Sequence, residues 1–133
     1  MAQQDKIKRE IDRIGLALAK LLSIALNKNS HREDSVKDVM QQTQNELEIN
    51  LPRFLEMDNN DSVQYLLKEK NFSLNHLRLF ANLLYETAGN TEDSAEHSKL
   101  KNKALNIYGY IHANANGTLY LDVVYRLKEL KEI

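Results

Sequence analysis

The chain has 133 residues, of which 42% are hydrophobic and 28% are charged, and its formal net charge is -1. These values are typical of one globular domain that is long enough to bury a core. A nearly neutral chain argues against nucleic acid or an anionic membrane as a partner, because each requires a clustered basic face. The absence of cysteine excludes disulfides, thiolate catalysis and cysteine-ligated metals.

The scarcity of glycine (4 residues) and proline (1 residue) predicts an all-α fold. We expect about six helices with antiparallel neighbours, arranged as a helical bundle in a single domain of residues 1–133. This domain divides into an N-terminal helix pair (1–50), a connector with a short helix (51–72) and a repeat-like helical layer (73–133). No apolar run reaches the roughly 18 residues that a membrane span needs. The start of the chain is unlike a signal peptide, so we expect a cytoplasmic protein without a membrane partner.

The first predicted helix, from about Gln3 to Asn27, carries a continuous apolar stripe at the helical period. Its residues are Ile7, Ile11, Ile14, Leu18, Leu21 and Ala25. The apolar surface is widened by Leu16, Ala17, Leu22 and Ile24. We therefore expect the C-terminal part of this helix to be buried on more than one side. The spacing also fits a coiled-coil seam over about three heptads. We favour a core helix, with a homodimer assembled through Ile7–Ala25 as the alternative.

A second helix is predicted from about Ser30 or Asp34 to Asn50, with a narrow stripe that belongs at the edge of the domain. Pro52 marks its end, because the residue before a proline is disfavoured in helical geometry. The proline can itself open a single helical turn. A short helix is then predicted over Ser62–Lys70.

The most informative stretch is Ser73–Ile133, which reads as three consecutive helices separated by Gly89 and Gly117. The first begins at Ser73, a typical capping residue, and ends at Gly89 in a position that often takes left-handed backbone. Its apolar residues predict the most buried helix of the domain. The next helix should begin near residues 91–94 and end near Asn114, and the last should carry Tyr120.

Two groups of residues have spacings that could hold a metal. Segment Asp58–Glu69 places oxygen side chains where a calcium loop has them, but β-branched Val63 stands where that loop turns on glycine. We favour an ordinary helix cap at Asp61. Asp93 and His97 lie one helical turn apart, but a site needs at least one further ligand. We therefore favour a surface helix at this pair, and expect no metal and no cofactor.

The sequence has no glycine-flanked serine of the nucleophile type and no glycine-rich phosphate loop, so we expect a protein that is not an enzyme. The remaining distinctive residues are tyrosines, a residue type enriched at recognition surfaces. The tentative partner-binding side chains are Tyr85, Tyr108, Tyr110 and Tyr120. The competing interpretation, which we favour for the rings as a group, is packing between helices.

Phe80-Ala81, Leu84 and Ala88-Gly89, followed by Ala104, Tyr108 and Ile111, resemble a tetratricopeptide-type hairpin. This resemblance implies a tetratricopeptide-like superhelix in the C-terminal half. The connection after Gly89 is longer than the repeat has, and no second copy follows at its period of about 34 residues. Separately, Asp5–Leu22 is similar to the start of a family of uncharacterised small bacterial proteins. That resemblance implies a bacterial origin and a helical fold, but no function.

Together these patterns predict a non-enzymatic, cytoplasmic interaction or adaptor protein that presents a helical groove to a protein or peptide partner. One alternative is a structural homodimer built on the first helix. The other is an enzyme or metal protein whose groups converge from distant helices.

Overall fold

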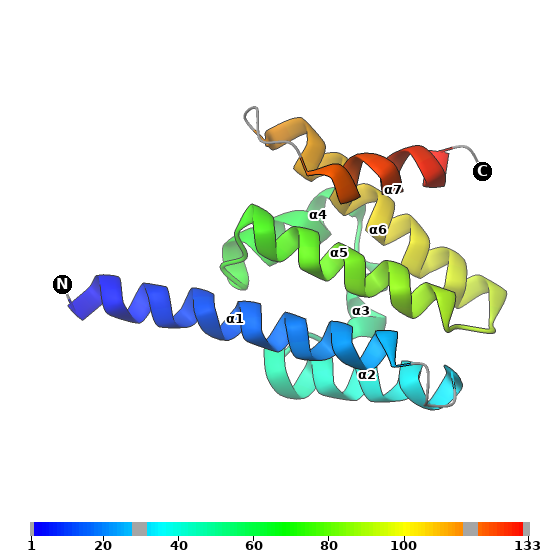
Figure 1. The fold of residues 1–133 in the computed structure, drawn as a ribbon, viewed down its shortest axis with the longest axis horizontal. Helices are drawn as coiled ribbons and strands as arrows, with labels where there is room; N and C mark the ends of the chain where they lie inside the picture. Colours follow the sequence, from blue (N-terminus) through cyan, green and yellow to red (C-terminus); the bar gives the residue numbers. More distant parts are fainter. Residues whose placement is uncertain (1, 28–31, 116–119, 132–133) are drawn as a thin grey trace.

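The fold is entirely helical in the part of the chain that the computed structural model describes, residues 2–27, 32–115 and 120–131 (Figure 1). Side chains are described for residues 9–10, 12–27, 33–115 and 120–129. The elements are α1 (Ala2–Leu26), α2 (Arg32–Leu47), α3 (Leu51–Glu56), α4 (Asn59–Gln64), a π-helical turn η1 (Tyr65–Glu69), α5 (Leu74–Gly89), α6 (Ser94–Asn114) and α7 (Leu121–Lys131). The all-α prediction is confirmed, with seven α-helices in these ranges where about six were expected. None of them is both long and apolar enough to cross a membrane.

Helix α1 packs antiparallel to α2, and α5 packs antiparallel to α6. Helices α1, α5 and α7 run in the same direction (Figure 1). Arg13 in the first half of α1 donates to the carbonyl of Glu46 at the end of α2 (3.1 Å), which sets these two helices antiparallel. The side-chain amide of Asn90, just after α5, donates to the carbonyl of Ala25 near the end of α1 (2.8 Å). The ends of α1 and α5 therefore coincide. An ion pair likewise joins the first turn of α7 to the first half of α5.

Helix α5 lies at the centre of the core, between α1 and α6, as its apolar pattern predicts. Its Leu77, Phe80 and Leu84 have no exposed surface. On α1 the buried side chains are Ile14, Ala17, Leu18, Leu21 and Ala25. The described part of the predicted stripe, Ile14, Leu18, Leu21 and Ala25, is thus buried inside the molecule. The predicted seam residues Ile7 and Ile11 lie outside the described side chains.

Local capping explains where the helices begin. The Ser73 hydroxyl accepts from the backbone N–H of His76, and the Ser73 N–H donates to His76 Nδ1, each at 3.1 Å. This reciprocal pair starts α5 at the predicted serine, with histidine in place of the usual glutamate or glutamine. At α3, the Asn50 side chain accepts from the N–H of Arg53 (3.2 Å), and Pro52 occupies the first turn, where proline is tolerated.

Two boundaries in the first half differ from the predicted ones. Helix α2 ends at Leu47 rather than Asn50, because Glu48 takes left-handed backbone with φ 56°. The short helix predicted over Ser62–Lys70 begins earlier, at Asn59, and changes into η1 before it ends.

A tetratricopeptide-like superhelix is not shown by the described helices. The two antiparallel pairs, α1 with α2 and α5 with α6, are separated along the chain by α3, α4 and η1. A repeat of that type joins its hairpins by short turns. The fold is accordingly a helical bundle with two hairpins and a final helix.

Candidate functional site

Two of the tyrosines proposed from the sequence as partner-binding residues form contacts between α5 and the α7 region. The hydroxyl of Tyr85 hydrogen-bonds the Glu129 carboxylate (2.5 Å), and the Arg126 guanidinium lies 3.9 Å from the centre of the same ring. Tyr120 directly precedes α7, and its ring lies 5.4 Å from the Arg78 guanidinium. The hydrogen bond to Glu129, helped by partial burial, raises the pKa of Tyr85. Part of each tyrosine surface is therefore used inside the molecule.

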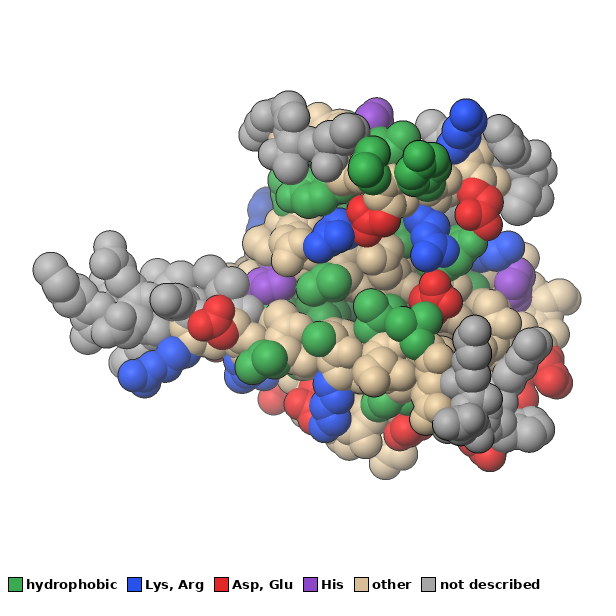
Figure 2. Space-filling view, viewed as in Figure 1, with side chains coloured by type: hydrophobic (Ala, Val, Ile, Leu, Met, Phe, Trp, Pro, Cys, Tyr) green, Lys and Arg blue, Asp and Glu red, His purple; other side chains and the backbone are tan. Residues whose placement is uncertain are grey.

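Ion pairs continue this contact, and we call the whole set the α5–α7 polar seam. Arg78 pairs with Asp122 (3.2 Å), and Arg126 pairs with Glu86 (3.3 Å). Burial alone would raise the pKa of Asp122, but the hydrogen bond from Asn82 and the charge of Arg78 outweigh it and hold that pKa below its ordinary value. Figure 2 shows the seam as blue and red side chains between α5 and α7. These partly buried, cross-linked pairs dock α7 on the bundle.

Tyr108 and Tyr110 differ in how much surface they offer. Tyr108 has no exposed surface, and its hydroxyl donates to Asn82 Oδ1 (2.5 Å). Burial strongly raises the pKa of Tyr108. A side chain without exposed surface cannot contact a partner of the folded protein. The prediction of Tyr108 as a partner-binding residue is therefore wrong. Tyr110 is half-buried against the core. Tyr125, which was not in the tentative binding set, is 68% exposed.

The segment with calcium-loop spacing surrounds a cation that belongs to the chain itself. Lys103 of α6 is 4% exposed, and its Nζ donates to the carbonyl of Met57. The same Nζ lies 3.2 Å from Asn59 Oδ1 and 3.3 Å from Ser62 Oγ. Burial lowers the pKa of Lys103. Val63 is buried within α4, as the helical interpretation of this segment predicted. The oxygens of this segment therefore serve to fix α6 against the α3–α4 connection.

Asp93 and His97 have separate structural partners. The Asp93 carboxylate accepts from the backbone N–H of Glu96 (2.9 Å) and so caps the start of α6. His97 Nδ1 lies 2.6 Å from the carbonyl of Ala88, close to the end of α5. The described residues contain no group of three or more histidine, aspartate and glutamate side chains placed to hold a metal. The pair is accounted for by the α5–α6 turn.

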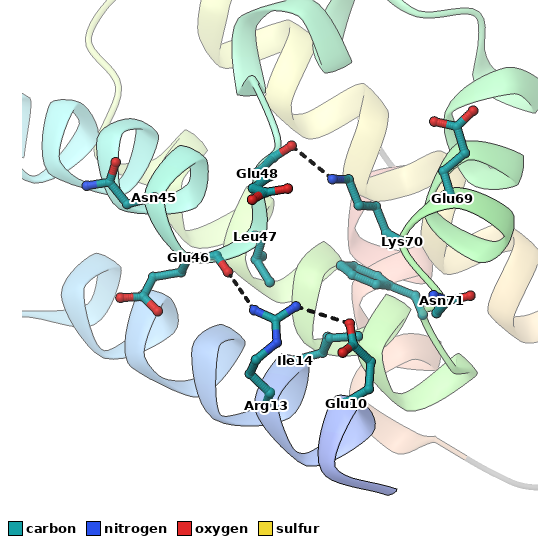
Figure 3. A pocket seen from close by; sticks show the side chains of 11 residues that line it. Glu10, Arg13, Ile14, Asn45, Glu46, Leu47, Glu48, Glu69, Lys70 and Asn71 are labelled. Atoms are coloured by element: carbon teal, nitrogen blue, oxygen red, sulfur yellow. Dashed lines mark hydrogen bonds and ion pairs between the residues drawn. The ribbon is translucent and has the colours of Figure 1, made fainter. Parts of the chain in front are cut away.

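A polar hollow of about 280 Å³ surrounds the end of α2 (Figure 3). Its cations point at the last carbonyls of that helix: Arg13 donates to Glu46 O (3.1 Å), and Lys70 donates to Glu48 O (2.9 Å). Arg13 also pairs with Glu10 (3.2 Å). Cationic side chains at a helix C-terminus satisfy its unpaired carbonyls and complement its dipole. The hollow is therefore explained as the cap of α2.

Two residues that line this hollow, Glu48 (φ 56°) and Asn71 (φ 58°), have left-handed backbone although neither is glycine. Each follows the end of a helical segment, and after η1 the N–H of Phe72 donates to the carbonyl of Leu66 (3.0 Å). That bond spans one residue more than the usual closure of a helix that ends on a left-handed residue, in keeping with the wider π-helical turn before it. Asparagine adopts this backbone readily, whereas other side chains incur roughly 1–2 kcal/mol of strain.

An exposed apolar surface on α1 and α5 is the feature that internal contacts leave unexplained. We call it the apolar face, and it consists of Leu16, Ala19, Leu22, Ser23 and Leu26 of α1 with Leu79 of α5. Leu16 is 73% exposed and Leu26 is 52% exposed, whereas Leu18 and Leu21 of the same helix are fully buried. Figure 2 shows apolar side chains along α1 and α5, set apart from those of α7 by the polar seam.

Most of the apolar face surrounds a shallow groove of about 690 Å³. The groove is lined by Ala19, Leu22, Ser23, Ile24, Leu26, Asn27 and Leu79. No charged side chain occurs among these described lining residues. Apolar grooves of this kind accept the apolar side of a helix or an extended apolar segment, with packing rather than charge as the source of affinity.

The sequence indicates the width of the apolar surface of α1 but not its exposure. Leu16 and Leu22 were expected to be buried on a second side of the helix, and for Leu16 this expectation is wrong. A second stripe, offset from the buried one, was the available signal: Leu16, Ala19, Ser23 and Leu26 follow one another at spacings of three, four and three.

No protein-family model, curated protein or solved structure matches the chain. The two resemblances drawn from the sequence therefore assign neither a family nor a function.

Proposed function

We propose that this protein is a non-enzymatic interaction module that binds a protein or peptide partner on its apolar face. The observation that carries the proposal is the exposure of Leu16 (73%) and Leu26 (52%) beside an uncharged groove. Burying one such side chain on binding stabilises a complex by about 1.5–3 kcal/mol. A partner that covers both leucines and the groove would therefore gain several kcal/mol from this surface.

The proposed binding mode is a helix in a groove, with the partner laid along α1. The groove lies between two helices that run in the same direction, and Leu79 of α5 forms its second wall. An amphipathic helix presents apolar residues at spacings of three and four, which suits a groove built from residues at the same spacings. The polar seam beyond α5 would bound the partner on that side.

The tyrosines have a smaller role in this proposal than the sequence suggested. Tyr85 and Tyr120 are engaged by Arg126 and Arg78, and their rings support the docking of α7. The proposal therefore moves the binding surface from the tyrosines to the outer side of α1.

Site-specific photocrosslinking in the native cell tests the proposal. A benzophenone amino acid is placed at Ser23, which is exposed within the apolar face, and in a separate protein at Asp38, which is exposed on α2. Covalent adducts are expected from position 23 and not from position 38. The Leu26→Lys variant should abolish the adduct while helical content, measured by circular dichroism, stays the same. A third protein carries the same probe at Ala19, which is also exposed within the apolar face. Absence of adducts from both position 23 and position 19 would refute this binding surface.

A further inference from the structure

We infer that His76 is an acid-sensitive switch: its neutral imidazole caps the first turn of α5 beside α1, and protonation of the ring breaks that cap. The inference is independent of the proposed partner surface, because it concerns the start of α5 and needs no partner. It rests on which ring nitrogen accepts a hydrogen bond, on the burial of the ring and on the groups around it.

The cap of α5 requires a lone pair on His76 Nδ1. The Ser73 N–H donates to this nitrogen at 3.1 Å, while the Ser73 hydroxyl accepts from the backbone N–H of His76. In an imidazolium both ring nitrogens carry a proton and neither can accept. Protonation would therefore place two donors against each other and leave the Ser73 N–H without its acceptor. Glutamine, a usual residue at this position of a capping box, accepts the same bond without a titratable group.

Burial keeps the ring from taking up a proton in place. His76 is 3% exposed, and its ring packs edge-on against Phe72 with the ring centres 5.8 Å apart. On the side of α1, His76 Nε2 lies so close to Gly15 that a Cβ there would be 3.8 Å away. A positive charge on this ring would be largely removed from water, which is costly.

The direction of the pH effect follows from the cap and the burial together. A histidine in an unfolded chain takes up a proton near pH 6.5, or about one unit either side of it. The folded protein with its cap intact resists the same proton, so unfolding below that pH takes up a proton. The stability that the cap contributes is thus complete above about pH 6.5 and is lost as the pH falls.

The described cations near the start of α5 are engaged elsewhere. Arg78 of α5 pairs with Asp122 (3.2 Å), and Arg13 of α1 pairs with Glu10 (3.2 Å). Lys70, in the connection before α5, donates to a carbonyl at the end of α2 (2.9 Å). These contacts do not involve the acceptor nitrogen of His76, so they leave the cap as the group that responds to its protonation.

Asp12 of α1 is the acid that would act against the switch. It precedes Gly15 by three residues, which is about one helical turn, and it is exposed. A carboxylate next to an imidazolium favours the charged ring. An ion pair between Asp12 and His76 would therefore reverse the sign of the pH effect, and the measurement below distinguishes the two signs.

Loss of the cap would loosen α5 where it packs on α1. Leu77 follows His76 directly, has no exposed surface, and donates its N–H to the Ser73 carbonyl (3.0 Å). Leu79, two residues further on, lines the apolar groove beside α1. Acid would thus act from the capped turn toward the wall of that groove.

The other histidines with described side chains lack this arrangement. His97 Nδ1 faces the carbonyl of Ala88 (2.6 Å), which is an acceptor, so a protonated ring keeps that contact. His112 is exposed in the last turn of α6, where a cationic side chain complements the helix dipole. His112→Gln is therefore the matched control for His76→Gln.

Urea unfolding of the full chain, followed by circular dichroism from pH 7.5 to pH 5.0, tests the switch. The wild type is compared with His76→Gln, which keeps a capping-box residue but cannot titrate. The unfolding equilibrium constant of the wild type relative to His76→Gln should rise about fivefold or more over this range, because uptake of one proton changes it by up to about tenfold per pH unit. His112→Gln should follow the wild type.

Nuclear magnetic resonance of the wild type supplies a measurement that needs no variant. At pH 7.5 the nitrogen shift of His76 Nδ1 should be that of an accepting nitrogen without a proton. On acidification, the ring signal and the Ser73 amide signal should change together, at a pH below the ordinary histidine value of about 6.5. This measurement decides the question if His76→Gln does not fold.

Three outcomes would overturn the inference. One is an equal pH dependence in the wild type and His76→Gln. Another is a wild type that gains stability relative to His76→Gln on acidification, which would indicate an imidazolium paired with an acid such as Asp12. The third is a protonated Nδ1 in the folded protein at pH 7.5, because such a nitrogen cannot accept from Ser73.

Discussion

Replacing Tyr108 by phenylalanine should change the way in which stability depends on pH. The Tyr108 hydroxyl is buried and donates to Asn82 Oδ1 (2.5 Å). Because burial raises the pKa of Tyr108, the folded protein holds this proton more tightly than the unfolded chain does. Above the ordinary tyrosine pKa of about 10, unfolding therefore releases a proton, and stability falls as the pH rises.

Two magnitudes of opposite sign determine the result. Below pH 10 the Tyr108→Phe variant should be less stable by about 1–1.5 kcal/mol, because it lacks one buried hydrogen bond and leaves the Asn82 oxygen without its donor. Above pH 10 the wild type loses an additional 1.4 kcal/mol or so per pH unit that the variant does not lose. The two stability curves should therefore meet at about pH 11, roughly one unit above the ordinary pKa.

Urea unfolding followed by circular dichroism at half-unit steps from pH 8 to pH 11.5 measures both curves. Effects of other groups cancel in the difference between the two proteins. Tyr125→Phe is the matched control, since this ring is 68% exposed, and its stability should stay within about 0.5 kcal/mol of the wild type at neutral pH. A constant offset between wild type and Tyr108→Phe over the whole range would show that the phenol does not titrate as its burial requires.

Three stability predictions, each measured by urea unfolding at pH 7.5, follow from other residues. Glu48→Gly should stabilise by about 0.5–1 kcal/mol, because losing Cβ relieves left-handed strain and the freer unfolded chain offsets only part of that gain; Glu48→Ala should give no comparable gain. Lys103→Met should destabilise by about 2–3 kcal/mol, since the Met57 carbonyl and the Ser62 hydroxyl lose a charged neighbour. A loss under about 1 kcal/mol would contradict its role as an internal cation. Asp93→Ala should cost about 1 kcal/mol and Asp93→Asn much less, because asparagine also caps helices; equal losses would contradict the capping role.

The helices themselves were predictable because each depends on information within a few residues. The stripe of α1 and the run from Leu77 to Leu84 in α5 both repeat at the helical period, and both are buried. The serine that starts α5 and the asparagine near the end of α6 lie at the predicted places. Left-handed Glu48 was not predictable, because that backbone is stabilised by Lys70, which lies 22 positions away in the sequence.

The polar contacts were missed for the same physical reason. Lys103 meets Met57 across 46 positions, and Tyr85 meets Glu129 across 44. Nothing local distinguishes a lysine that fills a ring of oxygens from a lysine on a solvated face. The oxygen-rich segment near Asp58 was expected to hold a helix cap at Asp61 rather than a cation, but Asp61 lies inside α4 and Lys103 of α6 binds the oxygens of Asn59 and Ser62.

The case of α1 shows why the candidate surface was harder to predict than the fold. A helix with a wide apolar surface can bury its second side only if the same chain supplies another helix to cover it. In the described structure α1 packs against α2 and α5, and its Leu18 and Leu21 are buried, whereas its Leu16 and Leu26 stay exposed. The sequence therefore measures how much apolar surface α1 has, and the packing of the other helices determines how much of it remains for a partner. Leu16 and Leu26 are the leucines of α1 that the described part of the chain leaves exposed, and their exposure is a property of the packing rather than of the α1 sequence.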